Sequence, residues 1–374
     1  MSKNKYIIIL QKNNMKVLLI TKLLNHTLHE NILSPLLASS HIAHIYVLRD
    51  FEGITTDDRV IYLNPEKKLT SKIRHIKKII NGVDYCKKYD IDVIIGVLIY
   101  PHGYIGQAIS FFTKKPYIHV TIAGHREYWM HGKLVEKLNI SLFKRSRFIT
   151  VTGKQTESYL LKKNVNPKQI VTLPNLPNSI FLSVDNNPEN ERKYDIISFS
   201  RIDKNKNVAL LMKALVKVKK VYPQVRVFVG GNGSEFDNVK QLSIELGLKD
   251  NVYFAGFVSE KHDIIKAYSD SSIFISCSKG EGFPVSLIEA MACGCVPVVS
   301  NVGDIVDVVD AENGCVFNDT ENETELAEIL IHLLTTKGLL SKMSAKAMNI
   351  KTTISVENNA KIWDSMFKAI SSSK

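Results

Sequence analysis

Short apolar runs alternate with longer amphipathic segments along most of the chain, and this alternation predicts the class of fold. An uninterrupted apolar run such as residues 92–99 is typical of a parallel strand that is covered on both faces. In residues 68–88 apolar side chains recur at helical spacing, which places Ile73, Ile76 and Ile80 on one side of a predicted helix. Alternation of strands and helices over this distance predicts a doubly wound parallel sheet.

The pattern restarts after residue 191, so the predicted elements fall into two groups. The first group has predicted strands at 15–21, 41–48, 59–63, 92–99, 117–122, 148–152 and 170–173, and predicted helices at 68–88, 104–112, 133–143 and 155–163. The second has predicted strands at 195–199, 225–229, 252–254, 272–277 and 296–300, and predicted helices at 207–222, 235–246, 261–268, from 284 onward, 324–335, 339–349 and 356–370.

A chain of 374 residues exceeds what one hydrophobic core usually carries, so two domains are expected. The segment 174–191 is rich in proline and asparagine and follows neither periodicity, which is typical of a linker. We therefore expect a first domain at 1–175, a linker at 176–192 and a second domain at 193–355. Residues 356–374 are expected to form a C-terminal helix that packs back on the first domain.

The net charge of +12 is distributed unevenly. Residues 1–180 hold 27 lysines and arginines against 12 acidic residues, whereas residues 181–374 hold 22 against 25. A basic half favours an anionic partner, and an anionic membrane surface fits because each nearby Lys or Arg adds about 1 kcal/mol of attraction. The basic residues expected on that surface are those of 68–88 and the run 144–147, with a solvated charged face as the alternative. No nucleic-acid-binding motif accompanies the charge, so a nucleic acid partner is not expected.

The five cysteines are odd in number, lack a C-x-x-C pair and lie mostly in apolar contexts, which favours reduced, packed thiols. No apolar stretch reaches the roughly 18 residues that a membrane-spanning helix needs. These features predict a cytoplasmic protein whose membrane contact, if it has one, is peripheral on the cytoplasmic face.

The most informative stretch is SKGEGFPVSLIEAMACGCVP at residues 278–297. It follows a predicted strand, and Pro284 suits the first turn of a helix, so the segment is expected to be strand, glycine-bearing loop and helix. A helix start beside glycines favours a phosphate group. Glu281 and Glu289 are a little over two helical turns apart, so both carboxylates can border one cleft and accept hydrogen bonds from hydroxyls.

This stretch resembles the E-x7-E signature of the retaining glycosyltransferases of family 4, here from Glu281 to Glu289. The resemblance implies the GT-B architecture, with two facing Rossmann-like domains and a cleft between them, of which the first holds the acceptor and the second the donor. It covers roughly residues 170–370 through several motifs, and the first half only through topology and a few residues.

The resemblance also implies roles for residues of the second half. Arg201 and Lys206, in FSRIDKNKN after a predicted strand, are expected to hold the donor diphosphate. Glu281 is expected to orient the donor sugar and Glu289 to bind the ribose. The loop residues expected beside the donor are Gly231, Gly233, Phe257, Val258, Gly282, Phe283 and Pro284. Plain turn geometry explains the glycine cluster at 230–233 equally well, and strand-end packing is an alternative for Phe257 and Val258.

In the first half, His125 follows a predicted strand in AGHREYW and resembles a family histidine that contacts the transferred sugar. His102, after the preceding strand, is the alternative. No convincing D-x-D motif lies in a loop, and Arg201, Lys206 and the helix start near Pro284 can stabilise a leaving diphosphate. We therefore expect no metal and no cofactor other than a UDP- or GDP-linked sugar as co-substrate.

The family resemblance implies a retaining transferase that moves a sugar from a nucleotide diphosphate sugar to an acceptor hydroxyl. A front-face displacement is implied, in which the departing phosphate helps to deprotonate the acceptor. A saccharide or lipid-linked acceptor in cell-surface polysaccharide or glycolipid synthesis is the expected setting. A nucleotide-sugar epimerase, a sugar phosphorylase and a non-catalytic nucleotide-sugar-binding protein are the alternatives.

Overall fold

The computed structural model describes residues 15–51, 53–54, 57–63, 71–124, 128 and 132–372. The chain divides into two compact units. Unit 1 comprises Met1–Asn175 and Val356–Lys374, and unit 2 comprises Leu176–Ser355.

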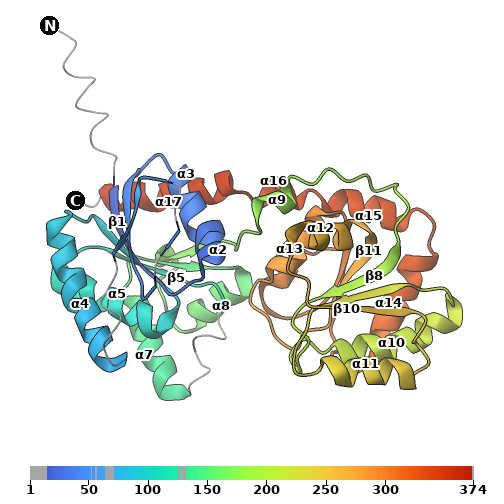
Figure 1. The fold of residues 1–374 in the computed structure, drawn as a ribbon. Helices are drawn as coiled ribbons and strands as arrows, with labels where there is room; N and C mark the ends of the chain where they lie inside the picture. Colours follow the sequence, from blue (N-terminus) through green and yellow to red (C-terminus); the bar gives the residue numbers. More distant parts are fainter. Residues whose placement is uncertain are drawn as a thin grey trace, which may run out of the picture. The chain divides into compact units, whose positions relative to one another are not determined.

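Unit 1 is built on a parallel sheet, which within the described residues has seven strands in the order β3-β2-β1-β4-β5-β6-β7 (Figure 1). Its strands are β1 (Met15–Ile20), β2 (Ile42–Leu48), β3 (Val60–Leu63), β4 (Val93–Val97), β5 (Tyr117–Val120), β6 (Phe148–Val151) and β7 (Ile170–Thr172). Its helices are α2 (Asn25–Leu28), α3 (Ser34–Ala38), α4 (Ser71–Lys88), α5 (Tyr104–Thr113), α7 (Lys133–Lys144), α8 (Lys154–Lys162) and α17 (Val356–Ser371), with helical turns at His29–Leu33, Ile99–Gly103 and Pro167–Gln169.

The sheet of unit 1 is buried on both faces because its strands are almost wholly apolar. One face packs against α4, α5, α7 and α8 through residues such as Cys86, Ile109 and Phe143. The other face packs against α2, α3 and α17 through Leu36, Trp363 and Phe367. Two hydrogen bonds from α17 to the rest of unit 1 are Asn359 Nδ2 to the Pro174 carbonyl at 2.9 Å and His41 Nδ1 to Asp364 Oδ1 at 3.0 Å.

Unit 2 repeats the plan with a parallel sheet of six strands in the order β10-β9-β8-β11-β12-β13. Its strands are β8 (Tyr194–Phe199), β9 (Val227–Gly230), β10 (Val252–Gly256), β11 (Ser271–Ser276), β12 (Val296–Ser300) and β13 (Cys315–Phe317). Its helices are α9 (Ser179–Leu182), α10 (Val208–Val221), α11 (Phe236–Glu245), α12 (Lys261–Ser269), α13 (Val285–Ala292), α14 (Glu323–Thr335), α15 (Leu339–Ala347) and α16 (Ile350–Thr353), with a turn at Gly303–Asp307.

The predicted linker, residues 176–192, belongs to unit 2. Leu176 and Phe181 are buried, and the Arg192 guanidinium donates to the carbonyl of Ser269 at 2.6 Å. A short helix, α9, forms within this segment. The proline-rich composition therefore indicates the linker between the units, and part of this linker packs on unit 2.

The buried face of helix α4 is not the one that its isoleucine spacing predicts. Ile73, Ile76 and Ile80 are exposed, whereas Lys78 and Cys86 are buried. The reason is close packing at Gly82, where a β-carbon would lie 2.3 Å from Ile109 Cδ1 of α5. Small side chains on the inner face let the two helices approach, and the isoleucines are left on the outside.

Candidate active site

The loops that follow β8 and β11 lie at the point in unit 2 where the order of the strands reverses. From β8 the chain proceeds to β9 and β10 on one side and then crosses to β11 on the other. In open parallel sheets, ligands bind outside the carboxyl ends of the strands at such a reversal point. A ligand site is therefore expected at the residues that follow β8 and β11.

The loop after β8 is organised by Asp203. Its Oδ1 accepts hydrogen bonds from the backbone N–H groups of Asn205 and Lys206, both at 3.0 Å. Its Oδ2 accepts from Arg201 Nε at 2.7 Å, which holds the guanidinium in place. Burial would raise the pKa of Asp203, but the bonds from the Lys206 amide and the Arg201 guanidinium outweigh burial and lower that pKa.

The loop after β11 is tied to the loop after β8. Lys206 Nζ forms an ion pair with Glu281 Oε1, and Ser278 Oγ donates to the same oxygen at 2.6 Å. Asn205 Nδ2 donates to the carbonyl of Gly280 at 2.8 Å, and the N–H of Lys279 donates to the Asn205 carbonyl at 2.8 Å. The two loops thus form one rigid wall on which a cation and a carboxylate are already paired.

The helix α13 begins beside this wall. Pro284 immediately precedes its first residue, Val285, and adopts an extended conformation, whereas the sequence predicted it inside the first turn. Within the described part of the chain, no side chain forms a capping hydrogen bond at this end of the helix. The backbone N–H groups at the start of α13 are therefore available to an anion, and the helix dipole favours negative charge there.

Two glycines allow the loops to approach one another. Gly231, after β9, has φ of 114°, and a β-carbon on it would lie 1.9 Å from the carbonyl oxygen of Ser200. Gly303 has φ of 61°, and a β-carbon there would lie 2.3 Å from the Glu281 carbonyl oxygen. Both positions require glycine because of the backbone conformation and the contact together.

These elements enclose a cavity of about 620 Å³. Eight of the residues predicted beside the donor line it, namely Arg201, Lys206, Gly231, Phe257, Val258, Glu281, Pro284 and Glu289. Its lining carries two cations and two carboxylates. Phe257 is 77 % exposed, which is unusual for an aromatic side chain and leaves its ring available to a flat partner.

Five further lining residues were not predicted: Phe199, Ser200, Asn232, Val285 and Ser286. Each lies within two residues of a predicted residue. Their position close to a strand end or helix start is therefore the feature of the sequence that could have identified them. Three predicted residues do not line the cavity. Phe283 is buried, the carbonyl of Gly282 accepts from the N–H of Asp304 at 2.9 Å, and Gly233 packs against the Ile202 carbonyl, so these three support the loops.

Two histidines of the first half, His125 and His102, were predicted as candidates for contact with the transferred sugar. His125 lies outside the described residues. His102 is 1 % exposed, and burial lowers its pKa to about 3, with the nearby Lys78 acting in the same direction. His102 is therefore a neutral, enclosed side chain in unit 1.

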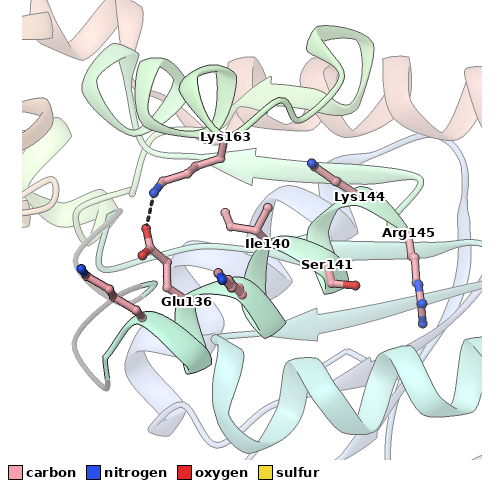
Figure 2. Close-up of a pocket in the computed structure, with 8 residues that line it drawn as sticks. Glu136, Ile140, Ser141, Lys144, Arg145 and Lys163 are labelled. Atoms are coloured by element: carbon pink, nitrogen blue, oxygen red, sulfur yellow. Dashed lines mark ion pairs between the residues drawn. The ribbon is translucent and has the colours of Figure 1, made fainter.

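Unit 1 has a cavity of its own, of about 710 Å³, which is lined by residues of α7, by Arg145 and by Lys163, the residue that follows α8 (Figure 2). Five cations and one carboxylate line it: Lys133, Lys137, Lys144, Arg145, Lys163 and Glu136. Figure 2 shows Lys163 directed toward Glu136, and the two form an ion pair at 2.6 Å. Hydrogen bonds from Lys163 and Tyr159 lower the pKa of Glu136, so the carboxylate stays charged and the cavity keeps a net positive charge.

Comparison with known proteins agrees with this geometry. Residues 181–349, nearly all of unit 2, match the family model described as glycosyl transferases group 1. The protein HepE from Anabaena, solved in complex with UDP, superimposes with a TM-score of 0.73 at 17 % identity, covering 96 % of this chain and 100 % of that one. The fold is GT-B. The predicted GT-B class is thereby confirmed.

The curated relatives match this chain over a smaller share of their length than HepE does. One component of the phosphatidylinositol N-acetylglucosaminyltransferase of Arabidopsis thaliana is 24 % identical over 56 % of this chain and 48 % of its own. A poly(glycerol-phosphate) alpha-glucosyltransferase from Bacillus subtilis is 25 % identical over 66 % of this chain and 36 % of its own. The chain thus spans between about a third and a half of the length of these curated relatives. Together the comparisons support a glycosyltransferase.

Among the described residues, no helix has the length and apolarity that crossing a bilayer requires.

Proposed function

We propose that this protein is a retaining glycosyltransferase of family 4 that transfers a sugar from a nucleotide diphosphate sugar to an acceptor hydroxyl. The observation that carries the proposal is the cavity of unit 2, where four charged residues meet. Arg201 and Lys206 come from the loop after β8, Glu281 from the loop after β11, and Glu289 from α13. A diphosphate needs cations and free N–H groups, and a sugar needs acceptors for its hydroxyls. The cavity supplies both.

Each part of the donor has a matching group. Arg201 and Lys206, with the start of α13, take the diphosphate and stabilise the charge that develops on it as the glycosidic bond breaks. Glu289, inside α13, accepts from a ribose hydroxyl. Glu281 orients the sugar, and the exposed ring of Phe257 with Val258 contacts the base.

Lys206 and Glu281 form an ion pair with each other. Binding of a diphosphate lets Lys206 exchange a carboxylate oxygen for a phosphate oxygen. Glu281 is then released to accept from the sugar. The pair therefore keeps both groups positioned without leaving either charge unmatched.

Catalysis follows from these contacts and from the family resemblance. In a front-face displacement the acceptor hydroxyl attacks on the side from which the diphosphate departs, and the departing phosphate oxygen takes the proton. His125 is proposed to contact the transferred sugar. Retention is tested by the anomeric configuration of the product in proton NMR, because a product of inverted configuration would contradict the family 4 mechanism.

The proposal includes independence from metal ions. Arg201, Lys206 and the helix start supply the positive charge that a divalent cation would otherwise provide to the leaving group. Activity should survive an excess of chelator. Loss of activity in chelator, restored by magnesium or manganese, would overturn this part of the proposal.

UDP is the favoured nucleotide among the UDP- and GDP-linked donors, because HepE was solved with UDP. A thermal-shift panel of UDP- and GDP-sugars tests the choice, since a ligand at 100 times its dissociation constant adds about 2.7 kcal/mol of stability. A panel in which no nucleotide sugar raises the melting temperature would contradict the donor site itself.

The acceptor is proposed to be a saccharide or a lipid-linked molecule in polysaccharide or glycolipid synthesis. The two curated relatives act, by their names, on phosphatidylinositol and on poly(glycerol-phosphate). Both of these molecules carry phosphate. The basic character of unit 1 suits an acceptor of this chemistry.

A cytoplasmic location with peripheral contact to an anionic membrane is part of the same proposal. Leu134 and Leu138 of α7 are 73 % and 53 % exposed, and the same helix carries cations of the basic cavity. Phe111 and Phe112 at the end of α5 are also exposed, and α5 is bonded to α7 from Tyr104 to Asn139 at 2.6 Å. Exposed apolar side chains among cations are typical of surfaces that lie on anionic lipid.

Two other functions fit the same cavity. A nucleotide-sugar epimerase would convert the donor without any acceptor. A non-catalytic binding protein would bind the donor and never turn it over. Proton NMR of UDP-sugar incubated with the protein, with and without acceptor, separates the three, because the transferase releases UDP fast only when an acceptor is present.

A further inference from the structure

The basic cavity of unit 1 is built on one stripe of α7. The residues of this helix that line the cavity are Lys133, Glu136, Lys137, Ile140, Ser141 and Lys144. They recur every three or four positions, so they share one side of the helix. Leu142 and Phe143 fall outside the stripe and pack in the core, whereas the three lysines of the stripe are exposed. The cavity is therefore open to a ligand from outside the unit.

The single carboxylate of the lining is already engaged within the cavity. Glu136 forms its ion pair with Lys163 and also accepts a hydrogen bond from the Tyr159 hydroxyl. Among the described residues, no carboxylate forms an ion pair with any of the other four cations of the lining. The cavity therefore presents four uncompensated positive charges, which favour a partner that carries more than one negative charge.

The lysines of the stripe are spread along the helix rather than gathered at one point. From Lys133 to Lys144 the helix rises about 16 Å, at about 1.5 Å per residue. The cavity that they line has a volume of about 710 Å³. A single phosphate group covers a small part of this span, whereas two linked phosphate groups can engage both ends of it. The spacing therefore favours a ligand with two phosphates.

Exposed apolar side chains border the cavity on the same helix. Leu134 is 73 % exposed and precedes Lys137 by three residues, and Leu138 is 53 % exposed and precedes Ser141 by three. Residues three apart are neighbours on a helix surface, so both leucines lie next to the lining. A water-soluble polyanion gains nothing from exposed leucines, whereas a lipid carries its phosphate beside an apolar part. The leucines therefore favour a lipid over a soluble partner.

We propose that the basic cavity of α7 binds the headgroup of an anionic lipid that carries two phosphate groups, with Leu134 and Leu138 in the membrane interface. This inference rests on the membrane contact that forms part of the proposed function. It goes beyond that contact because it specifies a discrete headgroup site instead of diffuse attraction between charges. The lysines donate to the phosphate oxygens, and the Ser141 hydroxyl adds a further donor.

The test is cosedimentation of the full chain with two sets of phosphatidylcholine vesicles. One set contains cardiolipin, which has two linked phosphates in each molecule. The other contains twice as much phosphatidylglycerol, which has one phosphate, so that both sets carry the same total charge. We expect binding to the cardiolipin vesicles to be at least about threefold tighter, because the second phosphate is already held near the cavity when the first has bound.

Two double variants assign this preference to the cavity. Lys137→Gln/Lys144→Gln should bring the ratio of the two affinities to about one, because it removes lysines of the headgroup site. Lys87→Gln/Lys88→Gln is the matched control, since these lysines at the end of α4 do not line the cavity and their loss removes the same charge from unit 1. It should leave the ratio unchanged. All four lysines are exposed, so both variants should melt as wild type does.

The outcomes separate the headgroup site from the membrane contact itself. Equal binding of wild type to both sets would leave the membrane contact in place and overturn the headgroup site. Binding to neither set would overturn both, and the donor cavity of unit 2 would still be tested independently with UDP. A ratio that stays high in Lys137→Gln/Lys144→Gln would also overturn the site.

The leucines supply the test of the lipid. Leu134→Ser/Leu138→Ser should weaken binding to both sets of vesicles, because it removes the apolar part of the surface. Unchanged binding in this variant would indicate a partner without an apolar part, such as soluble polyphosphate, and would overturn the proposal of a lipid.

Discussion

The pairing of Lys206 with Glu281 leads to the sharpest prediction, because the two residues should affect UDP binding in opposite directions. In the ion pair, each residue balances the charge of the other. Lys206→Met removes a cation that UDP needs. Glu281→Gln removes the carboxylate that competes with UDP for that cation.

The magnitudes follow from the burial of the pair. The side chains of Glu281 and Lys206 are 12 % and 20 % exposed. Removing one partner of a fully buried pair costs about 3–5 kcal/mol. Because both side chains touch water and Ser278 still donates to Glu281, we expect a loss of about 1–2 kcal/mol for Lys206→Met, or about 2–8 °C in melting temperature.

Calorimetry with UDP measures the effect on binding. A hydrogen bond to a charged group is worth about 1.5–3 kcal/mol, so Lys206→Met should weaken UDP binding roughly 10- to 150-fold. Glu281→Gln should bind UDP at least as tightly as wild type and transfer sugar much more slowly. Lys279→Met is the control, since Lys279 pairs with Glu321 outside the cavity. If Glu281→Gln lost UDP affinity as Lys206→Met does, the exchange of partners would be refuted.

Three other predictions follow from the structure. Gly231→Ala should lower both stability and UDP affinity, because its β-carbon would clash with the Ser200 carbonyl. Gly247→Ala is the control: Gly247 also has a positive φ but has open space around it, so this variant should lose stability alone. Chemical denaturation and calorimetry with UDP of both variants check this. Burial lowers the pKa of His119 from 6.5 to about 3, so folding favours its neutral form. Wild type should therefore lose about 2 kcal/mol of unfolding free energy between pH 7 and pH 5, and His119→Gln should not show this loss. The check is urea denaturation of both proteins at the two pH values, and an equal change in unfolding free energy for both would contradict the prediction. Leu134→Ser/Leu138→Ser should reduce cosedimentation with anionic liposomes, and wild-type binding should fall with added salt; binding that is absent or insensitive to salt would count against the membrane surface.

The sequence predicted the elements of unit 2 well because its motifs lie at strand ends. Arg201 and Lys206 follow β8, and Glu281 and Glu289 flank the start of α13, so topology alone brings them to one cavity. The direct pairing of Lys206 with Glu281 was not predicted. It depends on the turn around Asp203, which no periodicity reveals.

Other features depend on packing between elements that are distant in sequence. The spacing of the isoleucines in α4 suggests that they form the buried face. Close packing of Gly82 against Ile109 instead buries the opposite face of the helix and leaves the isoleucines exposed. The burial of His102 and Arg49 likewise arises from tertiary structure. Their neighbours in the sequence do not indicate that these polar side chains are enclosed.

The central claim, that the cavity of unit 2 holds a nucleotide diphosphate with Glu289 on its ribose, is tested most directly by one comparison. The dissociation constants of UDP, 2′-deoxy-UDP and 3′-deoxy-UDP are measured for wild type and Glu289→Ala. We predict that wild type binds UDP about 10-fold or more tightly than at least one deoxy analogue, as a hydrogen bond to a charged group implies, and that Glu289→Ala loses this preference. Equal binding of all three nucleotides by wild type, or the same preference in the variant, would contradict the account.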